Sequence, residues 1–193
     1  PMLNKQYTSM LQEKDVIFEI FQYATERAKV VGAENIYDFS LGNPSVPAPS
    51  IVNETIVQKV NTLDPLALHG YSPSFGIMEN REKIAAFLNK KYGSSYKASN
   101  IFMAIGAAGA LAHAFRAVTN PGDEIITFAP CFSEYKPYTA GAGLKLTIIP
   151  ADIDTFQINF AAFEAQLNEN TTAVLINSPN NPSGIVYSTE TIK

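Results

Sequence analysis

The sequence lacks the features that mark exported or membrane-bound proteins. Its single cysteine, Cys131, excludes an internal disulfide bond and favours a reducing compartment. No apolar run approaches the roughly 20 residues that cross a bilayer. The first residues also lack the basic and then apolar pattern of a signal peptide. We therefore expect a cytoplasmic protein without a membrane partner.

Several common kinds of site are missing as well. The 14 basic and 18 acidic residues are interspersed and give a net charge of −4, so no nucleic-acid partner is expected. His69 and His113 stand outside any metal-ligand spacing, and no metal is expected. The sequence has no Ser-His-Asp arrangement and no GxGxxG fingerprint of dinucleotide-binding folds.

The composition instead indicates a well-packed α/β domain. Hydrophobic residues make up 46% of the chain and charged residues 17%, which allows a large core. After residue 100, short apolar runs alternate with helical patterns, and this order predicts a three-layer α/β/α fold with a mostly parallel sheet. The predicted strands are 101–106, 125–130, 145–150 and 173–178. The predicted helices are 15–29 (ended by Gly32), 51–60, 76–91 (capped near Gly93), 107–118, 160–167 and one that begins after Ser188.

Small or unusual residues follow three of the predicted strands, and in a parallel sheet such positions face one crevice. The first group, Gly106 to Gly109, opens a predicted helix, where free N–H groups bind anions and small side chains admit a phosphate. The alternative is that these residues only let the helix pack on the sheet. In the second group, Phe132 is placed to stack on a flat ligand, although phenylalanine in the core is the plainer interpretation.

The third group is "NSPNNPSG", residues 177–184. Pro182 restricts Asn181 to extended backbone angles, and Gly184 permits a positive φ. The Asn181 amide is then held in one direction, from which it can donate to a phenolate or a carboxylate. A plain surface turn is the alternative, since Asn, Pro, Ser and Gly all form turns. Together, the three groups describe a site for a flat, phosphorylated cofactor.

These residues stand in motifs that resemble the amino-terminal half of fold-type I pyridoxal-phosphate enzymes, the class I/II aminotransferases. The resemblance runs from about Asp38 to Lys193. The motifs that carry it are "SLGNP" (40–44), "HGYSPSFG" (69–76), "GAAGAL" (106–111), "NPGDEIITFAPCFSEY" (120–135) and "INSPNNPSG" (176–184).

The resemblance implies a role for each of these positions around pyridoxal 5'-phosphate. Backbone N–H groups near the start of a helix would hold the phosphate, an aromatic ring would stack on the pyridine ring, and an amide would bind its 3-oxygen. Many family members have serine or threonine in the phosphate turn, and this chain has none. The implied cofactor-binding residues are Gly106, Ala107, Ala108, Phe132, Asn181 and Tyr71, of which Tyr71 reaches across a homodimer interface, and the implied substrate-binding residues are Gly42 and Asn181.

The resemblance implies that three groups of this chemistry lie beyond the Asn-Pro turn: the Schiff-base lysine, an acidic partner for the pyridine nitrogen and, usually, an arginine for the substrate carboxylate. In the family the Schiff-base lysine follows a serine or threonine in a small-residue loop, but none of the eleven lysines here follows serine, threonine or histidine. No catalytic residue is therefore expected on this chain, and the lysine is expected beyond Lys193. We interpret residues 1–45 as an N-terminal arm and small-domain segment, and residues 46–193 as the first part of the cofactor-binding large domain. The second half of the same polypeptide is an expected partner.

The resemblance implies an aspartate aminotransferase-like enzyme that moves an amino group between an amino acid and a 2-oxo acid. Two alternatives stay open. A carbon–sulfur β-lyase of the same fold shares every motif above. A non-catalytic effector-binding domain built on this fold is the other, because fold alone does not decide function.

Overall fold

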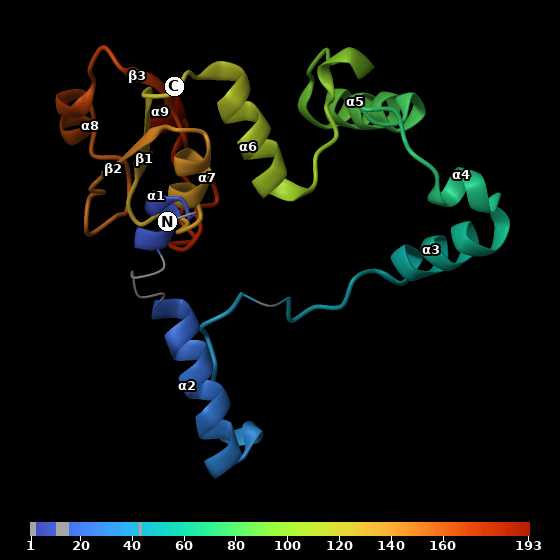
Figure 1. Ribbon diagram of the computed structural model, residues 1–193, viewed down its shortest axis with the longest axis horizontal. Helices are drawn as coiled ribbons and strands as arrows, with labels where there is room; N and C mark the ends of the chain where they lie inside the picture. Colours follow the sequence, from blue (N-terminus) through green and yellow to red (C-terminus); the bar gives the residue numbers. More distant parts are fainter. Residues whose placement is uncertain (1–2, 11–15, 43) are drawn as a thin grey trace. The chain divides into compact units, whose positions relative to one another are not determined.

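The structure is a computed structural model that describes residues 3–10, 16–42 and 44–193 (Figure 1). The predicted helix start at Asp15 and the Asn43 of the "SLGNP" motif lie outside the described residues. The chain divides between Ser74 and Phe75 into two compact units. The domain boundary expected after residue 45 stays a prediction.

The first unit is helical in its described part. The long helix α2 confirms the first predicted helix and places Phe21, Ala24 and Ala28 on one half-buried stripe. Gly32 follows its last turn with φ 89° and donates its N–H to the Ala28 carbonyl at 3.0 Å, as expected of a helix stop. The elements of this unit are α1 (Lys5–Met10), α2 (Val16–Val31), the 3-10 turn η1 (Ala33–Asn35), α3 (Ser50–Thr62) and α4 (Pro65–His69).

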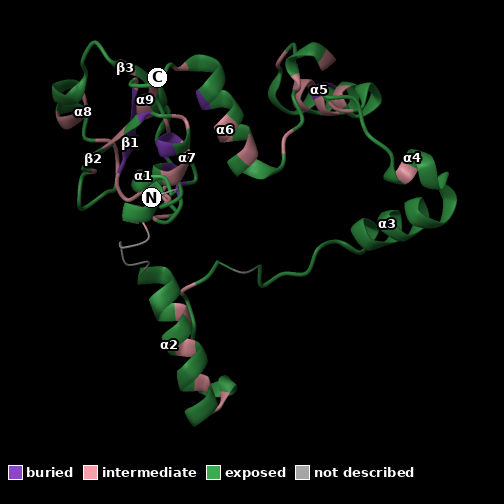
Figure 2. Cartoon of the chain, in the orientation of Figure 1, coloured by how far each residue is buried: buried purple, intermediate pink, exposed green. Residues whose placement is uncertain are grey.

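The second unit contains the sheet, and Figure 2 shows buried residues gathered around its strands and α7. Its helix ends follow the sequence signals: Gly93 caps α5 in the left-handed conformation, and the Ser188 hydroxyl accepts the Thr191 N–H at the start of α9. The elements are α5 (Met78–Tyr92), η2 (Ala98–Asn100), α6 (Gly106–Val118), β1 (Glu124–Phe128), α7 (Tyr135–Gly141), β2 (Lys145–Ile149), α8 (Phe160–Gln166), β3 (Thr171–Val174) and α9 (Thr189–Ile192).

The sheet has the strand order β2-β1-β3, and both pairings are parallel. One face carries Ile125 and packs under α6 through Phe115. The other face carries Ile126 and Phe128 and packs against α8 through Phe163. Successive residues of β1 are thus buried on opposite faces, which is why the strand reads as a continuous apolar run. Helices cover both faces, and the predicted α/β/α class with a parallel sheet is confirmed.

One predicted strand is wrong. Residues 101–106 form no strand, and their side chains Phe102 and Ile105 are 54% and 95% exposed. A strand needs a neighbour that accepts its backbone hydrogen bonds, and in the described residues β1 pairs only with β2 and β3. The Arg81 guanidinium instead binds the carbonyl of Ile101 at 2.9 Å.

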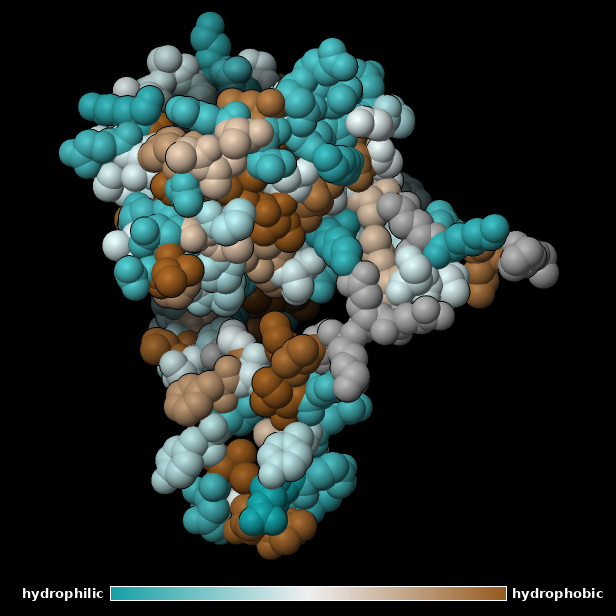
Figure 3. All heavy atoms as spheres, turned by 90° about the vertical axis from the view of Figure 1, so that its left-hand side faces the viewer, coloured by the Kyte–Doolittle hydropathy of each residue, from teal (hydrophilic) through white to brown (hydrophobic). Residues whose placement is uncertain are grey.

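Large apolar side chains also remain at the surface elsewhere in the described chain. Figure 3 shows them as brown groups among hydrophilic residues on the face it displays. They occur in both units, for example at Ile51 in α3 and Val118 at the end of α6. Val118 is 60% exposed, whereas Phe115 of the same helix is buried. None of the described helices is long and apolar enough to cross a membrane.

Candidate functional site

The strand order brings the ends of β1 and β3 together at one edge of the sheet. From the central strand β1 the chain passes to β2 on one side and later returns as β3 on the other. The turns that leave β1 and β3 therefore lie side by side at the carboxyl ends of these parallel strands, which is the end where open α/β sheets bind ligands. The structure brings two of the three predicted groups, 130–132 and 177–184, to this edge.

The turn after β3 is closed by its own hydrogen bonds. The backbone of Asn180 donates to the Ile185 carbonyl at 2.8 Å and accepts from the Gly184 N–H at 2.7 Å. Gly184 has φ 71°, a conformation that favours glycine. The Asn181 N–H donates to Oδ1 of Asn177 at 2.9 Å. These bonds anchor the Asn181 backbone, while its side chain is exposed at the turn.

Asn180 joins this turn to the one after β1. Its side-chain Nδ2 donates to the Pro130 carbonyl at 2.8 Å and to the Ser183 hydroxyl at 2.8 Å. Asn180 is only 7% exposed. Sequence reasoning missed this residue, because two adjacent asparagines in a turn carry the same sequence signal. The 50-residue separation from Pro130 hides the contact from any local pattern.

Phe132 lies half-buried just past β1. Its ring meets the buried Tyr135 edge to face, with centroids 5.7 Å apart and an interplanar angle of 82°. This arrangement suits the ring quadrupoles and leaves the orientation of Phe132 defined. Burial raises the pKa of the Tyr135 and Tyr187 hydroxyls and of the Cys131 thiol. These three groups are therefore neutral at physiological pH.

The start of α6 supplies free backbone donors. A short turn joins the end of α6 to β1, and the helix packs on that strand. The helix therefore runs antiparallel to β1, and its first residues point toward the carboxyl edge of the sheet. Gly106, Ala107 and Ala108 are exposed, and no side chain caps the helix. The first N–H groups of a helix have no intrahelical partner, and here Gly109 is the first residue to bond back, to the Ile105 carbonyl at 3.3 Å.

The other two predicted residues belong to the first unit. Gly42 is exposed, with open space around its Cα. Tyr71 is fully exposed. Their roles toward substrate and cofactor stay predictions.

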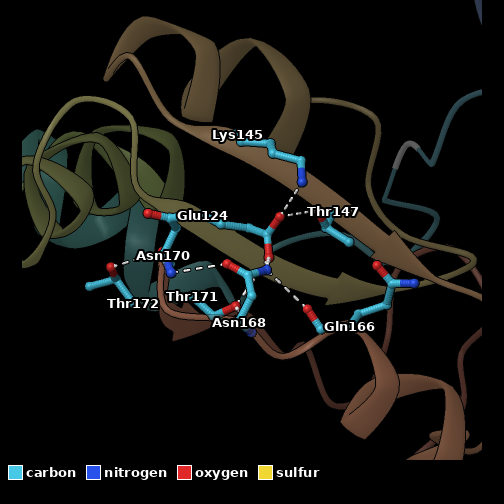
Figure 4. A network of polar contacts seen from close by, with 8 residues as sticks. All are labelled: Glu124, Lys145, Thr147, Gln166, Asn168, Asn170, Thr171 and Thr172. Atoms are coloured by element: carbon cyan, nitrogen blue, oxygen red, sulfur yellow. Dashed lines mark hydrogen bonds and ion pairs between the residues drawn. The ribbon is translucent and has the colours of Figure 1, made fainter.

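A second polar cluster lies at the opposite end of β1 (Figure 4). Glu124 is 2% exposed, and its Oε2 binds Lys145 Nζ at 2.5 Å and the Thr147 hydroxyl at 2.7 Å. Its Oε1 accepts from Asn168 at 2.8 Å and from the Thr171 hydroxyl at 3.1 Å. The hydrogen bond from Lys145, followed by those of the other donors, outweighs desolvation and lowers the pKa of Glu124 to about 2. Both oxygens of Glu124 are satisfied within the protein, so the cluster supports the sheet. In the described ranges no group of three His, Cys, Asp or Glu side chains is arranged to hold a metal ion.

The comparison with known proteins decides which family this site belongs to. The family described as aminotransferase class I and II matches residues 33–193. The chain belongs to the class I and II aminotransferases. The predicted resemblance is thereby confirmed.

Relatives of this family share both sequence and fold. An aspartate aminotransferase of Thermotoga maritima is 33% identical over 168 residues, covering 86% of this chain and 44% of the relative. The crystal structure of an amino transferase from Eubacterium rectale has a TM-score of 0.93 and 49% identity, covering 100% of this chain and 48% of that one. The Thermus thermophilus aspartate aminotransferase solved with maleate has a TM-score of 0.84 and 25% identity over 100% of this chain and 48% of its own. This chain thus spans about half the length of the relatives it matches.

Proposed function

We propose that the complete protein is a pyridoxal-phosphate-dependent aminotransferase of aspartate type, which moves an amino group between an amino acid and a 2-oxo acid. Family membership supports amino transfer, and relatives named as aspartate aminotransferases support the substrate class. These names favour amino transfer over the carbon–sulfur lyase and the effector-binding domain. A relative solved with maleate, a dicarboxylate, is in keeping with an acidic substrate.

The observation that carries the proposal is the pair of turns after β1 and β3, joined by the Asn180 side chain, together with the uncapped start of α6. Pyridoxal phosphate presents a dianionic phosphate, a flat pyridine ring and a 3-oxygen. Unpartnered N–H groups at the start of α6 suit the phosphate. A Cβ built at Gly106 would meet no atom within 4 Å, so there is room for an anion at the backbone. The oriented ring of Phe132 and the exposed amide of Asn181 suit the other two features. The residues present fit the cofactor.

Each residue has a simple task in this proposal. The N–H groups of Gly106, Ala107 and Ala108 hold the phosphate, and the absence of a serine or threonine leaves this task to the backbone. Phe132 covers one face of the pyridine ring and excludes water from it. The Asn181 amide donates to the 3-oxygen, which favours its anionic form. When bound, the cofactor supplies the electron-withdrawing ring that loosens the bonds at the amino acid's α-carbon.

Other parts of the proposed enzyme complete the site. The backbone of Gly42 would bind the substrate carboxylate with Asn181. Tyr71 would reach the phosphate bound by the other protomer of a homodimer. The Schiff-base lysine would come from the second half of the polypeptide. A cytoplasmic location is in keeping with the single cysteine.

The test uses the complete enzyme. Pyridoxal phosphate is added, fixed by borohydride reduction, and the labelled lysine is found by peptide mass mapping. We expect the label outside residues 1–193, and we expect the unreduced enzyme to convert aspartate only when a 2-oxo acid is supplied. Pyruvate release from cystathionine without a 2-oxo acid would support the lyase, and cofactor binding without any turnover would support the effector domain. A label on one of the eleven lysines of this chain would contradict the proposed division of the site.

A further inference from the structure

Asn180 lies between the two turns that carry the ring-binding groups, but it occupies neither predicted contact position. It directly precedes Asn181, and its partner Pro130 lies two residues before Phe132. Its Nδ2 atom has two hydrogens, and both are used, one on Pro130 and one on Ser183. The side chain thereby connects two segments that are 50 residues apart in the sequence.

The direction of the amide follows from its partners. The atom of Pro130 that faces it is a carbonyl oxygen, which only accepts hydrogen bonds, so a donor must point toward it. A flipped amide would place Oδ1 against this oxygen and leave two acceptors in contact. With 7% exposure, water has little access to replace a lost bond. The contact therefore depends on a donor at this position.

We propose that Asn180 is a positioning residue that sets the distance between Phe132 and Asn181. Through this distance it sets the affinity for the cofactor ring. The inference rests on the proposed function. The backbone bonds of the turn hold Asn181 within its own loop, but among the bonds of this turn the Asn180 amide is the one that reaches the Phe132 segment at Pro130. The start of α6 takes no part in this contact. Loss of the donor should therefore weaken the hold on the ring and leave the hold on the phosphate unchanged.

The test compares two Asn→Asp changes in the same turn of the complete enzyme. In N180D, a carboxylate replaces the donor that faces Pro130. In N177D, the same charge is introduced, but Oδ1 still accepts the Asn181 N–H. Dissociation constants are measured for pyridoxal phosphate and for pyridoxal, which lacks the phosphate. We expect N180D to weaken both ligands by roughly 10- to 100-fold, since a tenfold loss corresponds to ~1.4 kcal/mol and buried hydrogen bonds are of this order. We expect N177D to stay within about threefold of the unmodified enzyme.

The ratio between the two ligands separates positioning from general damage. If Asn180 acts on the ring, N180D leaves the preference for pyridoxal phosphate over pyridoxal unchanged. A large change in the ratio of the two dissociation constants overturns the inference. Equal losses of affinity in N177D and N180D also overturn it. Hydrogen exchange in the cofactor-free enzyme gives a second readout: N180D should speed exchange in both 129–135 and 177–187, and unchanged exchange in 129–135 also overturns it.

A milder variant covers the case in which N180D does not fold. S183A removes one of the two acceptors that orient the Asn180 amide, so the bond to Pro130 is held less firmly, and we expect a loss of about two- to fivefold for both ligands. No loss in S183A then counts against the inference. If the unmodified enzyme binds neither pyridoxal nor pyridoxal phosphate, the proposed function fails, which is a separate result.

Discussion

The carboxylate of Glu124 is buried at the start of the central strand and yet stays ionised, because four donors point at its two oxygens. These donors belong to β2 and to the segment that enters β3. The β1–β3 register shifts at this point, between Glu124 and Ile125. One charged residue thus joins all three strands where their pairing is least regular.

This arrangement predicts a pH-dependent contribution to stability. The pKa of Glu124 is about 2 in the folded protein and near 4.5 in an unfolded chain. A depressed pKa stabilises the fold fully above the unfolded value, and the contribution is lost as the pH falls from about 4.5 toward 2. In E124Q the free energy of unfolding should be lower by about 1–3 kcal/mol at pH 7 and should change less over this acid range.

Urea unfolding of the complete protein at pH 7 and at pH 3 measures both effects. The exposed Glu169 provides the control, because E169Q should shift stability by no more than about 0.5 kcal/mol. Equal pH profiles for E124Q and the unmodified protein would show that the network contributes no pH-dependent stability.

At the level of elements, the start of α6 depends on one glycine. Gly106 has φ 65°, whereas Gly109 lies within the helix at an ordinary angle. A Cβ at Gly106 would meet open space, and a Cβ at Gly109 would touch Ile105 at an ordinary 3.8 Å. The two positions therefore separate backbone strain from steric contact.

We expect opposite effects of the same substitution at these two positions. G106A should lower the free energy of unfolding by about 1–2 kcal/mol, because an L-residue is strained in the left-handed region. G109A should raise it by up to about 1 kcal/mol, because alanine favours a helix interior. Thermal unfolding of both variants measures this, and stabilisation by G106A would mean that the helix does not begin with a positive φ.

The sequence predicts elements best where local chemistry and packing agree. β1 and β2 are strands because their apolar runs pair with each other and the central β1 is covered on both faces. Residues 101–106 are a similar apolar run. Whether such a run pairs with another strand depends on distant residues, and its own sequence does not show this. In the same way, the groups at Gly106, Phe132 and Asn181 were predicted from their places after apolar runs. Asn180 was not, because its role depends on a contact with Pro130.

At the level of the whole molecule, the surface carries more apolar side chains than its fold explains. Exposed apolar groups such as Phe102 and Ile105 stand on the segment before α6. The relatives are about twice as long as this chain. In the proposed enzyme, the second half of the polypeptide would cover part of this surface, because exposed apolar surface is stabilised by burial.

This inference predicts a change in dye binding. The 193-residue chain alone should bind the hydrophobic dye ANS strongly, and an equimolar amount of the remaining segment of the complete protein should reduce the fluorescence severalfold. An unrelated segment of equal length serves as the control. Fluorescence that the cognate segment leaves unchanged would contradict the inference.

The strand order also bears on how the protein is made. β1 lies in the middle of the sheet although it is synthesised before β2 and β3. As the chain leaves the ribosome, β1 and β2 can pair and fold α7 onto them while β3 is still being translated. The bridge from Asn180 to Pro130 forms only after both strands are in place. The pairing of β1 with β2 can therefore precede the bridge that joins the turns after β1 and β3.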